Sequence, residues 1–531
     1  MRRRHSNRPW PELPGRRILA RPRACGIGSR RVRDDRHRWD RRGSPLRLLL
    51  AAWIAAAAGC AVLRPGPVPP PGPNILLVVA DDLGLQAGAY GETLVRTPAL
   101  DALAREGVLF ERAYATTGIC CPSRAAIYTG RYPHGIGMLG FVGDGFRLDP
   151  GVPTVAELAR RAGSFAAGAG KLHAAPADAF PWARPWTSFR QGDTAGIAKI
   201  AGRLLDAAAR RGRPFFLMIN PHDPHEPSEQ QPEFPLPRPV RLAPDKLTVP
   251  GFVVVKRATR IRLSKYNRRV ERFDRTLAAL LAELDRRGLA RSTAVFVTSD
   301  HGPPFDGAKR TLYEPGVRVP LVVRWPGRLP AGRRVPVPVS LVDLAPTFAE
   351  IMGMRPDPRA DGVSLLPLLE GRSEEHPPVF GTHTYSRGFQ YYPQRSIVAG
   401  RYKFIRNLRP DVEFRLGNGG TPGEIDRSPE NLARLARLVI RPAEELYDLE
   451  EDPGERRNLA EDPARAATLA ALRAELRAFL ARTRDPLLAL WDRAPGDPDP
   501  FQPERAGGQP WRARWLPESI RKLLPRPAAA P

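Results

Sequence analysis

The sequence is short of cysteine, of acidic residues and of long apolar runs. Its four cysteines, two of them adjacent, are too few and too unevenly placed for a disulfide framework. The apolar stretch at 48–58 is too short to span a bilayer, which takes about 20 residues. Acidic residues number 56 against 83 Lys and Arg, so the 531-residue chain carries a formal charge of +27. Such a basic chain suits a polyanionic partner, nucleic acid or sulfated glycan, and charge alone does not choose between them.

The first 60 residues are typical of a targeting segment. An arginine-rich region precedes the apolar stretch, and small residues follow it, as in export signals. Ala58-Gly59-Cys60 resembles a bacterial lipobox, whose cysteine becomes the lipidated first residue of the mature protein; a plain cleaved signal is the alternative. We therefore expect residues 1–60 to direct export, with the product a periplasmic or cell-envelope lipoprotein of a bacterium attached to the membrane through Cys60. Residues 61–73 then form a proline-rich tether.

Four apolar runs have the composition of buried strands. They are Asn74 to Ala80, Ser164 to Gly170, Pro214 to Ile219 and Thr293 to Thr298. Amphipathic helical patterns alternate with them, at 97–105, 152–161, 197–210 and 266–287. This alternation predicts an α/β fold in which helices cover both faces of a mostly parallel sheet.

Each of these runs ends in polar residues that are capable of chemistry. They are Asp81 and Asp82, then Lys171 and His173, then His222, and finally Asp300 and His301. In such folds ligands bind beyond the carboxyl ends of the strands. A single acid after a strand is more often a turn or a helix cap, but four strands that end in this way are not explained by capping. The sequence therefore predicts a functional site at this edge.

A reactive cysteine is predicted in the segment TGICCPSRAAIYTGR at 117–131. Pro122 suits the first turn of a helix, so Cys120 lies at a helix N-terminus, where free N–H groups favour a thiolate or another anion. The neighbouring Cys121 fits the role of a small buried apolar residue. We expect the two cysteines to differ in chemistry.

At this point the sequence resembles the type I sulfatases of the alkaline-phosphatase superfamily, and within them the sulfamidases that act on heparan. The resemblance covers about residues 74 to 490. Seven ordered motifs carry it: DDLG at 81–84, CCPSRAAIYTGR at 120–131, GKLH at 170–173, HDPH at 222–225, SDHG at 299–302, KRTLYEPGVRVP at 309–320 and ELYDLEEDPGERRNLA at 445–460.

The resemblance implies a domain organisation. It predicts an alkaline-phosphatase-like sandwich, with a catalytic domain at 74–374 built on a large mostly parallel sheet. A smaller C-terminal subdomain at 375–490 would hold an antiparallel sheet and a helix at 463–482. Residues 491–531 are rich in Pro and Gly and are expected to form a tail.

The resemblance also implies a modified residue and a metal. The family oxidises the motif cysteine to formylglycine by a dedicated maturase, and the spacing to Pro122 identifies Cys120 as that residue. By the same resemblance one divalent cation, Ca²⁺, would be held by three carboxylates and by an oxygen of residue 120. His301 stands where many relatives carry Asn, so it is either a less usual ligand of this cation or a neighbour of the ligands. The carboxylates are Asp81, Asp82 and Asp300, and oxygen ligands suit a hard cation.

Catalytic roles follow from the resemblance. A hydroxyl of the hydrated aldehyde would attack sulfur, with Asp300 accepting its proton. His222 and Lys309 would bind the sulfate and protonate the leaving group, and His173 would deprotonate the second hydroxyl to release sulfate. Arg124 and Lys171 would orient and polarise residue 120.

The resemblance and the sequence leave the substrate more open than the reaction. N-sulfoglucosamine of heparan-type glycans is the leading interpretation, and Arg387 and Arg395 are candidate substrate-binding residues. Arg387 lies in the segment where sulfamidase-like relatives commonly have an acidic residue. It would either meet a carboxylate or second sulfate of the substrate or be a solvated loop residue, so a glycan O-sulfate stays open. The alternatives are a phosphonate or phosphate monoester hydrolase of the same superfamily and a basic glycan- or nucleic-acid-binding protein without catalysis. No nucleic-acid motif is visible, so no nucleic-acid partner is expected.

Overall fold

The structure is a computed structural model that describes residues 72–227, 234–388, 390–417, 424–494, 497 and 499–502. The predicted leader with Cys60, all but the end of the tether and most of the predicted tail lie outside these residues. Among the helices of the described part, none is both long and apolar enough to cross a membrane.

The predicted strands form one half of an eight-stranded sheet. β3 (Phe165–Gly170), β4 (Phe215–Asn220), β1 (Asn74–Ala80) and β5 (Thr293–Ser299) are parallel neighbours in that order. In this register Val78 lies between Ile219 and Val297. All four strands are buried on both faces, as their continuous apolar runs predict. Their carboxyl ends meet at one edge.

The other half of the sheet contains the antiparallel pairs. β6 (Arg318–Arg324) runs antiparallel to β5 and to β2 (Val108–Tyr114), and β2 pairs in parallel with β7 (Arg333–Val335) and β8 (Val339–Ser340). Only the two pairs that β6 forms are antiparallel among the described strands of this sheet, so the prediction of a mostly parallel sheet is confirmed.

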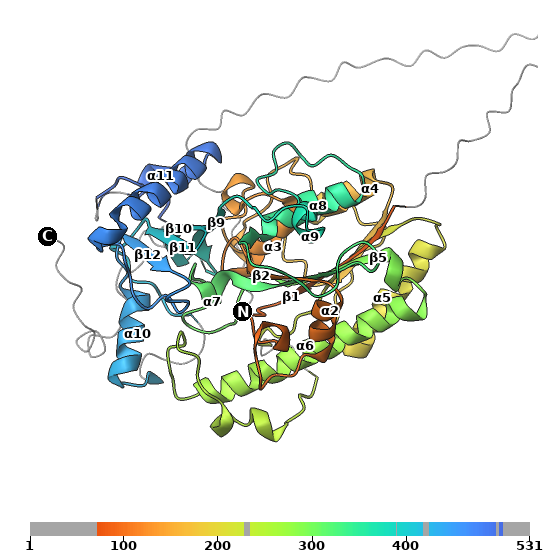
Figure 1. The fold of residues 1–531 in the computed structure, drawn as a ribbon, viewed down its shortest axis with the longest axis horizontal. Helices are drawn as coiled ribbons and strands as arrows, with labels where there is room; N and C mark the ends of the chain where they lie inside the picture. The colour runs from red at the N-terminus through yellow and green to blue at the C-terminus, as the bar shows by residue number, and fades with distance from the viewer. Residues whose placement is uncertain are drawn as a thin grey trace, which may run out of the picture. The chain divides into compact units, whose positions relative to one another are not determined.

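Helices cover both faces of this sheet (Figure 1). One face packs against α3 (Cys120–Thr129), α4 (Val155–Arg161), α8 (Leu344–Ile351) and α9 (Leu366–Leu369). The opposite face packs against α2 (Pro98–Glu106), α5 (Thr194–Ala209) and α6 (Thr259–Arg286). Successive side chains of β1 enter the two cores alternately, because side chains alternate along a strand. α6 begins seven residues before the predicted Tyr266.

A second, four-stranded sheet follows in sequence. Its strands are antiparallel in the order β12 (Glu444–Asp448), β11 (Tyr402–Asn407), β10 (Gln390–Ala399) and β9 (Val379–Ser386). α11 (Ala466–Arg482) packs against this sheet, and Asp462 caps the short turn before it by accepting from the Ala464 N–H. α10 (Pro429–Val439), which the sequence analysis did not predict, and the short α7 (Glu314–Val317) complete the architecture.

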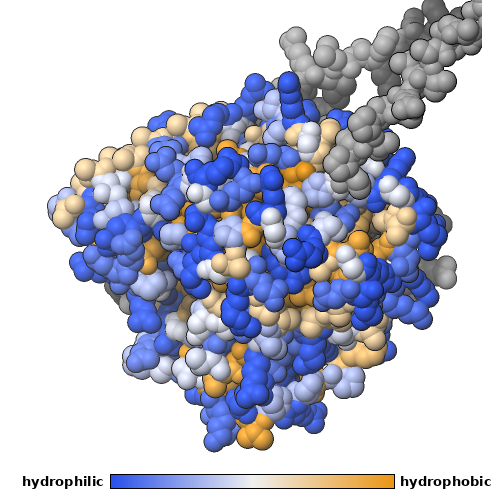
Figure 2. Space-filling model, turned by 45° about the vertical axis from the view of Figure 1, so that its right-hand side comes forward, coloured by the Kyte–Doolittle hydropathy of each residue, from blue (hydrophilic) through white to orange (hydrophobic). Residues whose placement is uncertain are grey.

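The surface is mainly hydrophilic on the face that Figure 2 shows, and its apolar residues are scattered in small areas. Only four large apolar side chains among the described residues are markedly exposed: Leu94, Val240, Ile261 and Val363. Isolated exposed apolar side chains of this kind are normal for a globular protein and carry no argument for a docking surface.

Candidate active site

Three carboxylates meet where β1 and β5 end. The Asp300 N–H donates to the Ala80 carbonyl at 3.2 Å, and the Asp82 N–H donates to Asp300 Oδ1 at 3.0 Å. Asp81, Asp82 and Asp300 are fully buried. Three unpaired carboxylates would not remain ionised in such a place, so their partners decide the electrostatics of the site.

Each carboxylate is paired with a buried cation from another element. Lys171 Nζ lies 2.5 Å from Asp81, Lys309 Nζ lies 2.8 Å from Asp82, and Arg124 Nε lies 2.9 Å from Asp300. Burial opposes ionisation of these carboxyls, but the cations outweigh burial and hold the pKa of each carboxyl below its ordinary value. The pKa of Asp82 is lowered to about 2. We refer to these six residues as the edge cluster.

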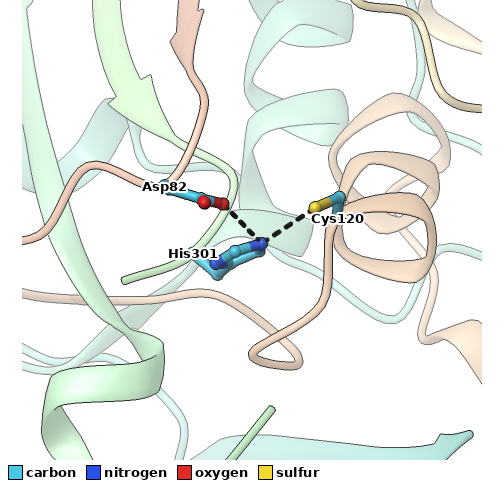
Figure 3. A group of neighbouring side chains, drawn as sticks. All are labelled: Asp82, Cys120 and His301. Atoms are coloured by element: carbon cyan, nitrogen blue, oxygen red, sulfur yellow. Dashed lines mark hydrogen bonds and ion pairs between the residues drawn. The ribbon is translucent and has the colours of Figure 1, made fainter. Parts of the chain in front are cut away.

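Cys120 begins α3 and points into this cluster. Its Sγ lies 3.2 Å from His301 Nε2, which lies 3.3 Å from Asp82 Oδ1. Figure 3 shows the three side chains pointing toward one another. Burial raises the pKa of the Cys120 thiol, but Lys171, Lys309 and His301 lower it on balance to about 7. Burial raises the pKa of Cys121 to about 12. The two cysteines therefore differ as predicted, since only residue 120 is electrostatically activated.

The donor set fits a hard divalent cation. Two overlapping groups, Asp82–Cys120–His301 and Asp81–Cys120–Asp300, have ligand atoms within 4.8 Å of one another. The carboxylates supply oxygen, and the thiol occupies the place where a modified residue 120 would present oxygen. The His301 Nδ1 lies 2.9 Å from the Gly302 carbonyl, which turns Nε2 toward the group. Burial lowers the pKa of His301, but Asp300, Cys120 and Asp82 raise it on balance to about 9. A cation bound at Nε2 would therefore take the place of a proton.

The loop that carries His222 is anchored behind the site. Asp223 follows His222, and its carboxylate points away from the edge cluster to accept two hydrogen bonds of 2.6 Å from Arg272 of α6. The Asp223 carbonyl accepts from the Asp81 N–H at 3.2 Å. Gln191 donates to Asp223 and to the His225 carbonyl. One buried ion pair therefore fixes both the histidine loop and the backbone of Asp81.

The two histidines for which the sequence predicts catalytic roles lie near Asp81 and Lys171, since both charges act on each imidazole. His222 is half-buried, with its ring edge-on to Phe189, and burial lowers its pKa to about 4. The His222 imidazole is therefore neutral at pH 7 in the metal-free chain. His173 is exposed and has a left-handed backbone with φ of 52°.

Several positioning residues escaped the sequence analysis. The Tyr266 hydroxyl accepts from the Gly84 N–H and lies 3.1 Å from the Asp82 carbonyl, so it holds the left-handed turn at Asp82. His225 Nε2 lies 3.9 Å from Asp82 Oδ2. Tyr266 lies on the apolar face of α6, and a buried hydroxyl there needs a hydrogen-bond partner. This feature of the sequence could have indicated a positioning role for Tyr266. Nothing local marks Arg272.

The two proposed substrate-binding arginines lie in different environments. Arg387 is exposed in the turn between β9 and β10, and the next residue, Gly388, donates from its N–H to Asp144. Arg395 is fully buried, with two bonds to Asp485 at 2.5 and 3.0 Å and further bonds to backbone carbonyls. All of this hydrogen bonding is internal, so the structure corrects the expectation for Arg395: its position is that of a structural ion pair.

Comparison with known proteins gives consistent matches. The family model described as Sulfatase matches residues 73–354, and the model described as N-sulphoglucosamine sulphohydrolase, C-terminal, matches residues 301–417. The chain is 31% identical to N-sulphoglucosamine sulphohydrolase of Homo sapiens, over 79% of this chain and 92% of that protein. It is 32% identical to an ulvan-active sulfatase of Formosa agariphila, over 74% and 76% of the two chains. The crystal structure of a phosphonate monoester hydrolase of Agrobacterium radiobacter shares the fold, with a TM-score of 0.61 at 21% identity over 78% and 97%.

Proposed function

Because the chain belongs to the sulfatase family, whose members are sulfuric ester hydrolases, we propose that it removes a sulfate group from a sulfated sugar, using a formylglycine formed at residue 120 and one divalent cation, Ca²⁺. The observation that carries this proposal is the placement of Cys120. It is buried at a helix N-terminus among Lys171, Lys309 and His301, and these cations are what a sulfate oxygen needs.

The metal and the modification each supply one element of the chemistry. The cation, held by Asp81, Asp82, Asp300, residue 120 and His301, would neutralise sulfate oxygens. The hydrated aldehyde would offer an oxygen nucleophile together with a second hydroxyl for turnover. A thiol or a serine has no such second hydroxyl, which supports modification of residue 120 as a condition of activity.

The side chains of the site then have separate tasks. Once a cation takes over the carboxylates, the ammonium groups of Lys171 and Lys309 become available to the sulfate, and Arg124 keeps Asp300 in place by its 2.9 Å bond. Asp300 would accept the proton of the attacking group. His222, held by the Asp223–Arg272 pair, is neutral in the free site, so it would have to gain a proton beside the bound sulfate anion before it protonates the leaving atom. His173 would remove the proton in the second half of the reaction.

The substrate we propose is N-sulfoglucosamine of a heparan-type glycan. The C-terminal family model and the human relative support it by their names. Arg387 lies in a turn that the Gly388 N–H anchors to Asp144, two residues after Val142, and the Val142 backbone contacts the Cys121 sulfur. This anchoring supports Arg387 as a residue near the substrate, where its charge suits a sugar with a further anionic group.

Two experiments test the function. Protein made together with a formylglycine-generating maturase should show the mass change at residue 120 and none at Cys121. That protein should then release sulfate from glucosamine N-sulfate, and it should turn over sulfates better than the matched phosphonate or phosphate monoesters. A preference for the phosphorus substrates would overturn the proposal, and activity of the unmodified protein would overturn the role of formylglycine.

Export remains a proposal that rests on the sequence of the leader. We propose that residues 1–60 direct the chain to the periplasm or cell envelope and that Cys60 is lipidated. Mass spectrometry of the mature N-terminus in a bacterial host tests both statements. A mature chain that begins elsewhere than at residue 60, without lipid, would contradict lipidation.

A further inference from the structure

Backbone outliers single out one arginine next to the active site. Five non-glycine residues of the described chain have a positive φ: Asp82, His173, Arg310, Glu455 and Arg484. Two of these belong to the site, and a third, Arg310 with φ of 71°, directly follows the site residue Lys309. Strained backbone of this kind persists where the surroundings impose it, and it concentrates at functional sites. Arg310 has no role in the chemistry described above.

Arg310 is fixed to the nucleophile segment by its backbone. Its N–H donates to the Gly118 carbonyl at 2.8 Å, two residues before Cys120. Its side chain extends to the small sheet, where Nη1 donates to Gln390 Oε1 at 3.0 Å. Gln390 begins β10, three residues after Arg387. Arg310 therefore connects the reacting residue with the hairpin that carries the other arginine.

The charge of Arg310 is poorly compensated. Among the described residues, the carboxylate paired with Arg310 is Asp306, at 3.7 Å from Nη2. Asp306 lies closer to Lys256, at 2.7 Å, and also accepts from the Gly417 N–H. The Nε of Arg310 is buried and has no hydrogen-bond partner among the described residues. Burial lowers the pKa of Arg310, and the nearby Arg415 adds to this effect. A buried cation with an unused N–H calls for an anion.

The guanidinium also lies in a space kept open for it. Arg310 is only 9% exposed, and a Cβ at Gly417 would overlap its guanidinium. The absence of a side chain at residue 417 thus lets the arginine lie against the backbone. This immobilises a group that would otherwise lose much side-chain entropy on binding a ligand.

We propose that Arg310 recognises a second anionic group on the sugar, a carboxylate or a further sulfate next to the one that is hydrolysed. This inference rests on the proposed function and names its substrate class, a sugar with two anionic groups. The planar guanidinium offers the paired donors that carboxylate and sulfate accept. A substrate with a single sulfate would leave this site unfilled.

The test compares substrates with one and two anionic groups. Arg310→Gln should raise KM for glucosamine 2-N,6-O-disulfate, or for a disaccharide of N-sulfoglucosamine and a uronic acid, by about 10- to 100-fold with little change in kcat. Arg310→Lys keeps the positive charge but lacks the paired N–H donors of the guanidinium, so its KM for these substrates should lie between those of Arg310→Gln and wild type. KM for an aryl sulfate should not change. The arm that responds identifies the second group as sulfate or carboxylate.

Arg324→Gln is the matched control. Arg324 is likewise nine-tenths buried, has one ion pair with Glu106 and an unpartnered Nε, and lies at the end of β6 remote from the carboxyl ends of the parallel strands. It should change the melting temperature without changing the ratio of KM values. Equal losses on all substrates, or an unchanged ratio in both arms, would overturn the inference and leave the proposed function intact.

Binding separates the two proposals further. Calorimetry with a Cys120→Ala background needs no turnover, and addition of Arg310→Gln to it should weaken binding of the disulfated sugar or the uronic-acid disaccharide by the same factor as KM. If wild type hydrolyses no sulfate but this difference in binding persists, the proposed function fails and the anion site stands.

Discussion

At the carboxyl edge of the large sheet three buried carboxylates meet three buried cations, whereas beside the small sheet one buried lysine lies between two carboxylates. The second group consists of Lys403, Glu314 and Glu455, with both N–O distances at 3.0 Å, and we call it the lysine cluster. The carboxyls of the edge cluster have lowered pKa values, but burial and Glu314 raise the pKa of Glu455 to about 7. Burial is equal in the two clusters, and the ratio of cations to acids differs.

That ratio separates a site from a structural element. The edge cluster is neutral as a set, with Asp81, Asp82 and Asp300 against Lys171, Lys309 and Arg124. A divalent cation would add two positive charges, of which the sulfate group of a substrate balances one and released sulfate balances both. In the lysine cluster Glu455 instead keeps its proton below about pH 7, because burial and Glu314 raise its pKa to about 7, and the Tyr114 hydroxyl donates to Glu314. A full set of counter-charges therefore favours binding of a cation and an anion together.

The largest expected effect is the loss of activity on substitution of residue 120, which the edge cluster surrounds. Cys120→Ala should lower kcat/KM by at least about 10⁴-fold, because it removes the group that reacts. Cys121→Ala should cost less than about tenfold, because burial raises the pKa of that thiol and keeps it inert. Sulfate release measured on protein made with maturase decides this. Comparable losses in the two variants would contradict the assignment of residue 120.

The next largest expected effect is on metal content, which substitutions in the edge cluster should change and substitutions in the lysine cluster should not. Asp81→Ala or Asp300→Ala should abolish bound Ca²⁺ and activity while the protein stays folded, because each removes a charged oxygen ligand. Asp300→Asn, which preserves shape, should do the same. Lys403→Met should leave the stoichiometry of metal unchanged but lower the free energy of unfolding by about 3–5 kcal/mol, since two acids lose their partner. Elemental analysis and denaturant unfolding supply the two readouts. Full metal and turnover in the aspartate variants would refute the ligand assignment.

Much of the fold and of the edge cluster follows from local sequence. A continuous apolar run that ends in Asp81-Asp82 is a local signal, and β1 has the predicted bounds. The antiparallel β6 and β2 escaped because strand pairing depends on residues far apart in the chain. Arg395 was misassigned for the same reason, since its partner Asp485 lies 90 residues later. The strained backbone of Arg310 likewise depends on its surroundings rather than on its own segment.

A smaller effect concerns the leaving group. His222→Ala should lower kcat by about 10²- to 10⁴-fold on glucosamine N-sulfate, whose amine needs a proton, and much less on an activated aryl sulfate. Arg272→Lys should reproduce this selectivity in weaker form, because it loses the paired bonds to Asp223 that hold the loop. The two effects should not add in the double variant if Arg272 acts through His222.

Arg287→Lys is the matched control for that measurement. Arg287 follows the end of the same helix and pairs with Asp206 and Glu283, away from the histidine loop. It should leave the ratio of the two substrates unchanged. Equal losses on both substrates in the His222 variant would mean that this residue binds sulfate or supports the structure, and the proton-donor role would be wrong.

The smallest expected effect is the pH dependence that the lysine cluster contributes. The folded-state pKa of Glu455, about 7, lies above its ordinary value of 4.5, so the folded protein binds the extra proton. The resulting stabilisation is full below pH 4.5 and is lost as the pH rises through about 7, with a limit of about 3 kcal/mol set by the size of the shift. Glu455→Gln should flatten this part of the profile. The difference in unfolding free energy between wild type and variant should therefore fall between pH 4.5 and 7.

Asp485→Asn is the control for this measurement. It should shift the unfolding free energy by a constant amount between pH 4.5 and 7, because Arg395 and His134 outweigh burial and hold the pKa of Asp485 at about 2. A pH-independent difference for Glu455→Gln would show that both acids of the cluster are ionised, and the contrast with the edge cluster would disappear.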